Sequence, residues 1–414
     1  MIKFEEITLD NGLKVVANFD PYTPMATLNL LYKVGAKHEN PHQTGVAHLF
    51  EHLMFSGSAN VPDFDAHVEN AGGNNNAYTT PDYTNYYISL PAANIETAFW
   101  LESDRMAAPV ITQEKLDIQK KVVIEEFKQR SLDPPYGDAM HFFLPLTYQK
   151  HPYRWPVIGE KIEHIESVTL DNALQFHKRF YNAANAVLTV SGNVKPEKVF
   201  QLAEKWFGDI QTPKVAPAVI PIEPEQHTAR TKTVTADVPL DAIYMAWPMQ
   251  GRDSKQFIQA DLLTDLLSFD RSSRFYQLMN QENAVFAELD AVVSGTVDNG
   301  LMLITGKVNS EYTVDDGLKV IQTEIEKIQQ TITEAEVLKV KNKNVTSNSV
   351  GRLDHGNKAP ALAFSAMMGE TNRINTVLDD YLKITVDDML NVAREVFDHR
   401  RCNTLLYKAK KLHT

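Results

Sequence analysis

The sequence predicts an α+β fold made of two homologous domains, and three observations support this prediction. The 414 residues are enough for two or three domains, each with its own hydrophobic core. A proline-rich stretch at residues 208–230 interrupts regular structure and divides the chain into halves of similar length. Both halves also run in the same order of strand, helix, strands and helices. We therefore expect a first domain at residues 1–210, a linker at 211–230 and a second domain at 231–414.

The internal repeat can be followed from element to element. In each half an expected strand is followed by an expected helix, then by further strands, and later by a long helix headed by Ile-Thr. The matched stretches are 27–34 with 242–248, 45–55 with 259–268, 64–90 with 274–306, and 111–114 with 332–335. The similarity is weak, but its order is kept along both halves, as in a duplicated domain.

Composition limits the classes of function. Hydrophobic residues make up 43% of the chain, but no apolar run reaches the ~18 residues of a membrane span, so we expect a soluble globular protein. Residues 1–6 show no signal peptide, which makes the cytoplasm the default expectation. A single cysteine, Cys402, excludes an internal disulfide framework. The net charge of -12 gives no footprint for nucleic acid or an anionic membrane, and it weakly favours cationic partners.

An apolar segment around residue 50 carries unusual polar side chains. Its apolar residues would surround most of a helix, which would then be largely buried; they are Val46, Leu49, Phe50, Leu53 and Met54. Yet the segment also contains His48, Glu51 and His52, which are costly to bury without partners. The two histidines lie one turn apart and can bind the same tetrahedral Zn²⁺, while Glu51 points beside the metal. This H-x-x-E-H spacing is the inverzincin signature. The alternative is a helix with two hydrogen-bonded histidines.

A zinc site that is open to water needs a third protein ligand from elsewhere in the chain. Residues 116–130 read as an amphipathic helix whose expected buried face holds Leu116, Val122, Val123 and Phe127. Glu126 falls among these residues, whereas Glu125 is rotated toward solvent. A carboxylate on a buried face is the unusual one, so we predict Glu126 as the third ligand.

Several stretches together resemble the pitrilysin-like zinc peptidases, and the resemblance covers essentially the whole chain. The stretches are 9–16 (LDNGLKVV), 45–48 (GVAH), 52–57 (HLMFSG), 72–80 (GGNNNAYTT), 82–87 (DYTNYY), 102–106 (ESDRM), 122–126 (VVIEE), 151–153 (HPY) and 180–186 (FYNAANA). The resemblance implies two homologous domains, each a mostly antiparallel sheet flanked by helices, which together form half of a clamshell. It also implies a zinc metalloendopeptidase that acts on peptides or unfolded segments.

The resemblance also assigns roles to individual residues. His48, His52 and Glu126 would hold Zn²⁺, and Glu51 would be the catalytic base that takes a proton from water and delivers it to the leaving amine. Residues 76–80 would form an edge strand to which an extended peptide adds, with Asn76, Ala77 and Tyr78 as substrate-binding residues and Asn76 near the reacting carbonyl. The alternative for this stretch is a turn followed by an ordinary strand in which the tyrosines mainly pack.

The chain departs from the family pattern beside the zinc site and in the second domain. Many members carry a second glutamate two helical turns before the metal-binding one; Gln119 stands here, so tuning of the zinc from outside its ligands is expected to differ. In the second domain Asp261 and Asp265 align with the two histidines, and Thr264 aligns with the glutamate. We therefore expect that only the first domain holds zinc.

A second departure concerns an arginine and a tyrosine that, in the family, reach over to the zinc site from the second domain. Met279 and Phe286 stand at these positions, and neither can donate a hydrogen bond. Arg274 and Tyr276 lie nearby, but we expect Arg274 to be structural. Loss of one oxyanion donor typically slows an enzyme by ~10²–10³. The chain is therefore expected to be the metal-bearing subunit of a heterodimer whose homologous partner supplies the arginine and tyrosine.

Three other interpretations remain. The chain could be a self-sufficient homodimeric peptidase in which a second copy or other donors complete the site. It could be a non-catalytic structural or assembly subunit, although retention of His48, Glu51, His52 and Glu126 argues against a scaffold. It could also be a zinc-dependent peptide-binding module. None of these interpretations, nor the favoured one, involves nucleic acid or a membrane.

Overall fold

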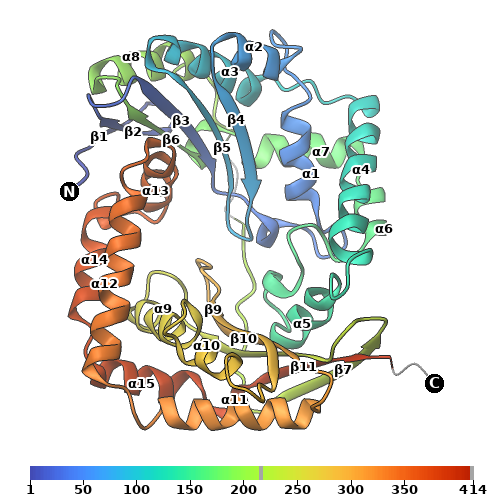
Figure 1. The fold of residues 1–414 in the computed structure, drawn as a ribbon. Helices are drawn as coiled ribbons and strands as arrows, with labels where there is room; N and C mark the ends of the chain where they lie inside the picture. Colours follow the sequence, from blue (N-terminus) through green and yellow to red (C-terminus); the bar gives the residue numbers. More distant parts are fainter. Residues whose placement is uncertain (214–217, 411–414) are drawn as a thin grey trace. The chain divides into compact units, whose positions relative to one another are not determined.

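The computed structural model describes residues 1–213 and 218–410 and divides into two compact units, each built on one β-sheet (Figure 1). The first unit comprises Met1–Phe127, Pro156–Ile220 and Asn348–Val377. The second comprises Lys128–Trp155, Pro221–Ser347 and Leu378–Thr414. The expected α+β class, with two sheets flanked by helices, is confirmed.

The first sheet has six strands in the order β1-β2-β6-β3-β5-β4. Only β2 and β6 pair in parallel, so the sheet is mostly antiparallel, as expected. The strands are β1 (Glu5–Thr8), β2 (Lys14–Phe19), β3 (Met25–Tyr32), β4 (Asn74–Thr79), β5 (Thr84–Pro91) and β6 (Ala186–Gly192). This order leaves β4 at one edge of the sheet, next to β5.

Helices cover both faces of the first sheet. Because side chains alternate along a strand, Leu30 joins one core while its neighbour Leu31 joins another, together with Leu362 and Ala363 of α13. The helices of this unit are α1 (Val46–Met54), α2 (Phe64–Asn70), α3 (Ile95–Ala107), α4 (Gln113–Phe127), α6 (Ile162–Glu166), α7 (Leu170–Phe180), α8 (Pro196–Phe207) and α13 (His355–Met367). Helix α13 packs against β3 and β6, on the face opposite to α1 and α3 (Figure 1).

The second sheet has five strands in the order β7-β11-β8-β10-β9. Its strands are β7 (Arg230–Ala236), β8 (Ala242–Met249), β9 (Phe286–Val293), β10 (Gly300–Val308) and β11 (Asn403–Ala409). One parallel pair, β7 with β11, is followed by antiparallel pairs. The first sheet shows the same arrangement from β2 to β4, as expected for two homologous domains.

The remaining elements belong to the second unit, contain residues of both units, or are short. The longer helices are α5 (Ala139–Thr147), α9 (Lys255–Ser268), α10 (Arg274–Met279), α11 (Val314–Ile328), α12 (Glu334–Gly351), α14 (Arg373–Lys383) and α15 (Val386–Val396). Short helical turns are η1 (Ala36–His38), η2 (Ala92–Asn94), the π-helical η3 (Lys128–Leu132), η4 (Pro152–Arg154), η5 (Ala183–Asn185) and η6 (His399–Arg401). Among the described residues, no helix combines the length and the apolar composition needed to cross a membrane.

The compact units differ from the continuous boundaries expected at 1–210, 211–230 and 231–414. Residues 128–155 pack with the second unit because Phe143 and Tyr153 share a core with Ala246 and Leu405. Residues 348–377 pack with the first unit through α13. At both ends of each segment the chain passes from one unit to the other within or beside a helix or helical turn, not in a proline-rich linker. Amino-acid composition therefore gave no signal for these unit boundaries. Positions 214–217 of the expected linker lie outside the described residues.

Candidate metal centre

Helix α1 begins at a glycine and a buried carboxylate. Gly45 has a φ of +87°, and a Cβ there would lie 2.8 Å from the carbonyl oxygen of Ile158, so glycine is required. The Gly45 and Ala47 N–H groups donate to the Glu39 carboxylate at 3.0 and 2.8 Å. A negative charge at the start of a helix also interacts favourably with the helix dipole. Glu39 thus fixes the first turn of α1, and one of the residues that it binds, Ala47, directly precedes His48.

The expected burial of α1 is observed. Leu49, Phe50 and Leu53 are each 1% exposed, while His48 is 7% exposed and Glu51 is half-buried. Phe50 packs against the Tyr181 ring, with the two ring centroids 4.5 Å apart. The apolar side of the helix is therefore fixed in the core, which holds the polar side in a defined orientation.

His48, His52 and Glu126 lie together. The Nε2 atoms of His48 and His52 are 3.6 and 3.3 Å from Oε2 of Glu126, and the two imidazole rings meet at 82° with centroids 4.8 Å apart. One potential ligand atom from each residue lies within 4.8 Å of the others. Ligand atoms about 2.1 Å from a tetrahedral zinc ion are about 3.4 Å from one another. Both nitrogen–oxygen distances are close to this value, so the donor set suits Zn²⁺ in chemistry and in spacing.

Helix α4 presents Glu126 as expected, with one difference in the rest of its face. Glu126 is half-buried and Glu125 is exposed. Leu116, Val123 and Phe127 are buried, but Val122 is 45% exposed, so its assignment to the buried face was wrong. Val122 lies one position before Val123, about 100° around the helix, which carries it off the stripe.

Two side chains of α4 bind Ser56, which lies two residues after the end of α1. Lys115 donates through Nζ to the Ser56 carbonyl oxygen at 2.5 Å, and Gln119 donates through Nε2 to Ser56 Oγ at 3.3 Å. Gln119, which stands where many family members carry a second glutamate, therefore connects α4 to the segment just after α1. Both contacts help to fix the helix of Glu126 relative to the helix of His48 and His52. Sequence reasoning gave no role to Lys115 or Ser56.

Glu51 is bound by a residue that the sequence analysis did not single out. Thr79 Oγ1 donates to Glu51 Oε2 at 2.5 Å. Thr79 is the last residue of β4, and its side chain lies on the same face of the sheet as that of Ala77, because residues two apart in a strand share a face. This alternation was the signal that could have identified it.

The expected substrate-binding residues lie on the edge strand. Asn76 and Tyr78 are exposed and Ala77 is half-buried. Tyr78 contacts the Tyr83 ring, which in turn contacts Phe364 of α13. The side chains of Asn76 and Tyr78 therefore lie on the face of the sheet that α13 covers, opposite to the side chain of Thr79.

Two sequence profiles of one peptidase family match the chain. Residues 14–157 match the profile described as "Insulinase (Peptidase family M16)", and residues 167–344 match that described as "Peptidase M16 inactive domain". The chain belongs to the pitrilysin-like M16 peptidase family. The H-x-x-E-H motif of this family member lies in the first of the two matched regions, and α9 lies in the second.

Relatives of this M16 protein are named as proteases. The chain is 28% identical over 414 residues to the "Zinc protease PqqE" of Helicobacter pylori, covering 98% of this chain and 93% of that protein. The crystal structure of a protease from Helicobacter pylori matches with a TM-score of 0.94 and 28% identity, covering 99% of this chain and all of that one. The periplasmic protease PqqL from Escherichia coli shares the fold, with a TM-score of 0.80 and 18% identity; the chain spans 47% of its length.

In the M16 repeat, α9 of the second unit corresponds to α1, and its carboxylates have other partners. Tyr381 donates its hydroxyl to Asp261 Oδ2 at 2.5 Å, and Thr264 donates to the Asp261 carbonyl oxygen at 2.8 Å. Burial raises the pKa of Asp261. Burial, and then the nearby charge of Asp261, raises the pKa of Asp265 to about 7. A carboxyl group whose pKa is raised in this way binds a metal less readily, because the metal must compete with a proton.

Met279 and Phe286, which stand at the positions of the missing family arginine and tyrosine, are both at least partly buried in the second unit. Phe286 is 2% exposed at the start of β9, where its ring packs over Gly306 and Gly317. Met279 is half-buried at the end of α10. Arg274 is held by Glu336 at 3.0 Å, by Glu324 at 3.3 Å and by the Thr331 carbonyl oxygen at 2.7 Å, as expected for a structural residue.

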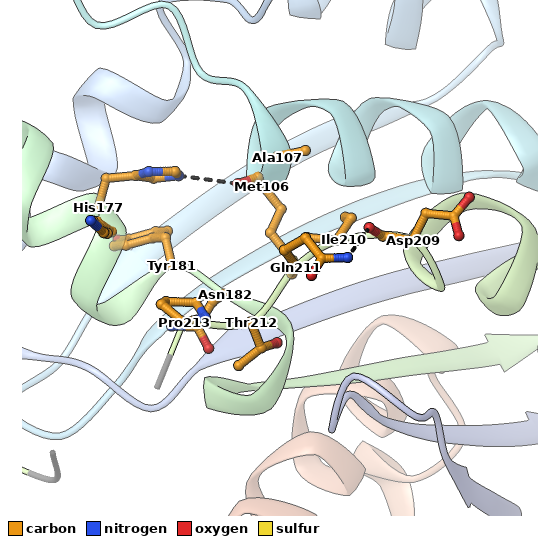
Figure 2. A pocket seen from close by; sticks show the side chains of 11 residues that line it. Met106, Ala107, His177, Tyr181, Asn182, Asp209, Ile210, Gln211, Thr212 and Pro213 are labelled. Carbon is orange, nitrogen blue, oxygen red and sulfur yellow. Dashed lines mark hydrogen bonds between the residues drawn. The ribbon is translucent and has the colours of Figure 1, made fainter. Parts of the chain in front are cut away.

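A separate pocket of about 640 Å³ lies between α3, α7 and the chain after α8 (Figure 2). Figure 2 shows His177 pointing toward Met106, and the His177 Nε2 atom lies 3.1 Å from the Met106 carbonyl oxygen. Burial lowers the pKa of His177. His177 and Tyr181 also flank Phe50 of α1, but none of the candidate zinc ligands lines this pocket. It is distinct from the metal centre.

Proposed function

We propose that this M16 chain is a zinc-dependent endopeptidase subunit that hydrolyses peptide bonds in peptides or unfolded segments. The observation that carries the proposal is the convergence of His48, His52 and Glu126 on one point, beside Glu51 on the same helix. Three protein ligands with a position left for water are the arrangement of catalytic rather than structural zinc sites. The names of the relatives, which are zinc proteases, support the same reaction class.

His48, His52 and Glu126 would hold the metal. When bound, Zn²⁺ lowers the pKa of a water molecule and polarises a carbonyl group. Glu51 accepts a proton from the water as its oxygen bonds to the carbonyl carbon, and then delivers this proton to the amine nitrogen as the C–N bond breaks. Thr79 holds one carboxylate oxygen of Glu51 and so restrains the direction in which the base acts.

The substrate is proposed to add to β4 as a further strand. Strand β4 is at the edge of the first sheet and pairs with β5 on one side. Main-chain hydrogen bonds along such an edge recognise an extended backbone with little regard for side chains. Since Thr79 of this strand holds Glu51, a peptide added to β4 would lie close to the base. This placement favours peptides and unfolded segments over folded proteins.

We further propose that a homologous subunit completes the site. Met279 cannot donate a hydrogen bond, Phe286 is buried, and Arg274 is held by two glutamates, so these side chains do not provide the missing donors. The chain spans 47% of the PqqL protease, which is room for a second half of similar size. The partner would supply an arginine and a tyrosine to bind substrate and stabilise the oxyanion.

The proposal is tested by purifying the chain, measuring its zinc content, and assaying peptide cleavage alone and with a related chain from the same organism. We expect bound zinc, weak cleavage alone and strong cleavage in the mixture. Glu51→Gln should abolish cleavage with zinc retained, while Glu125→Gln, the same change at an exposed position, should leave cleavage unchanged. Full activity of the chain alone would overturn the heterodimer, and cleavage by Glu51→Gln would overturn the assigned base.

A further inference from the structure

The hydrogen bonding of the β4–β5 hairpin fixes which backbone groups of β4 face outward. The Thr80 N–H donates to the Tyr83 carbonyl oxygen at 2.8 Å, at the end of the hairpin. In an antiparallel pair, alternate residues turn their N–H and C=O groups toward the partner strand. Counting back from Thr80, Tyr78 and Asn76 face β5, whereas Thr79, Ala77 and Asn75 turn their backbone groups toward the open edge. An added peptide strand would pair with these three residues.

One of these outward donors is already bound by the neighbouring side chain. The Ala77 N–H donates to Oδ1 of Asn76 at 2.8 Å. Asn76 itself is exposed, so its amide group lies at the surface of the edge where an added strand would come. Asn75 is held differently, because its side-chain amide donates to Asp65 at 2.9 Å. The Asn76 side chain therefore occupies a hydrogen-bond site on the outward edge of β4, the Ala77 N–H.

We infer that the Asn76 side chain is a cap on the substrate-binding edge, which a peptide must displace from the Ala77 N–H in order to add to β4. This inference rests on the proposed function. The peptide carbonyl takes the place of Oδ1, so the hydrogen bond that the peptide gains at the Ala77 N–H is offset by the one that Asn76 loses, and the displaced carboxamide returns to water. Displacing Asn76 selects against short or poorly extended segments. Only a peptide that pairs with several residues along β4 gains enough hydrogen bonds to offset the lost bond between Asn76 and the Ala77 N–H. The cap also protects an exposed edge from unwanted strand addition.

Hydrogen exchange of the Ala77 amide tests the cap directly. The full-length zinc-loaded protein would be labelled with ¹⁵N-alanine and compared with Asn76→Ala, Asn76→Asp and Asn74→Ala. Asn76→Ala should exchange faster at Ala77, whereas Asn76→Asp should remain slow because its carboxylate also accepts the bond. Asn74→Ala is the matched control, since Asn74 is an exposed asparagine on the same face of the same strand. Unchanged exchange in Asn76→Ala would overturn the cap.

Peptide affinity tests displacement. The probe is a fluorescein-labelled unstructured peptide of alanine, threonine and lysine, bound to zinc-loaded Glu51→Gln so that it is not cleaved. Removing the cap should tighten binding by about two- to tenfold, the range that one net hydrogen bond gives. Asn74→Ala should bind like the parent. Unchanged or weaker binding by Asn76→Ala would overturn the inference. If the parent binds and cleaves no peptide, the proposed function fails, whereas Ala77 exchange still decides whether the cap exists.

Discussion

Thr79 donates a hydrogen bond to Glu51, so the strand that is proposed to bind the peptide also holds the proposed catalytic base. Thr79 is at the end of edge strand β4, and Glu51 is on helix α1, one residue before His52. A shift of β4 would therefore move the proposed base relative to the candidate zinc ligands. This link gives a physical reason why peptide addition at the edge and proton transfer at the metal centre should depend on each other.

The first prediction removes the Thr79 hydroxyl. Thr79→Val keeps the branched shape but cannot donate to Glu51, and hydrogen bonds to charged groups contribute about 1.5–3 kcal/mol. Because the lost contact orients the base rather than the peptide or the metal, kcat should fall by at least about tenfold while KM and zinc content stay the same. Steady-state kinetics and metal analysis measure both effects.

Thr79→Ser is the control for this prediction, since it retains the hydroxyl and should restore most of kcat. A loss shared by Val and Ser would assign the effect to packing of β4 instead of to the hydrogen bond. A fall in zinc content in Thr79→Val would likewise show that the residue supports the metal rather than the base.

The second prediction concerns the third ligand. Glu126→Gln removes a charged oxygen donor, so zinc affinity should fall by more than the ~10–100-fold that is typical for a partner outside the ligand set. Glu125→Gln is the matched control, because Glu125 is the adjacent exposed glutamate of α4. Competition with a fluorescent chelator measures both variants. Equal affinities for the two would show that Glu126 is not a ligand. Stripping zinc from the parent should abolish cleavage, and adding it back should restore cleavage.

The third prediction concerns Gln119. Gln119→Ala breaks the contact with Ser56 that connects α4 to the end of α1, so the ligands should be less well aligned and zinc affinity should fall about tenfold. Gln119→Glu can accept a hydrogen bond from the Ser56 hydroxyl and should keep the parent affinity. The same chelator competition serves as the measurement. A loss of affinity in Gln119→Glu equal to that in Gln119→Ala would show that the contact with Ser56 does not support the metal.

Much of the candidate site could be predicted from the sequence because local patterns determine it. The one-turn spacing of His48 and His52 is a property of any helix, and the apolar residues around them required that helix to be buried. The same periodicity separated Glu126 from Glu125. The edge strand and the antiparallel sheets were expected from the family resemblance, which rests on many short stretches along the chain.

What could not be predicted depends on which distant segments meet. Thr79 and Glu51 are linked only because β4 packs beside α1, and Gln119 reaches Ser56 only because α4 does. The interleaved units have the same cause. Residues 128–155 and 348–377 look in sequence like ordinary parts of the half in which they occur, and only their packing assigns them to the other unit.

The fourth prediction concerns the carboxylates of α9, which stand where the first unit has its histidines. Burial and the charge of Asp261 raise the pKa of Asp265 from 3.8 to about 7, although Lys343 opposes this shift. Between these two values the folded state binds a proton that the unfolded state releases, so this residue makes the free energy of unfolding decrease as the pH rises from about 4 to about 7. Above that interval both states are ionised and the slope from this residue disappears.

Asp265→Asn should remove the slope and be more stable than the parent at about pH 8, whereas Asp237→Asn, at an exposed turn, should behave like the parent. Urea unfolding of each variant across this interval gives the comparison, and parallel curves for the parent and Asp265→Asn would show that Asp265 stays ionised in the folded protein.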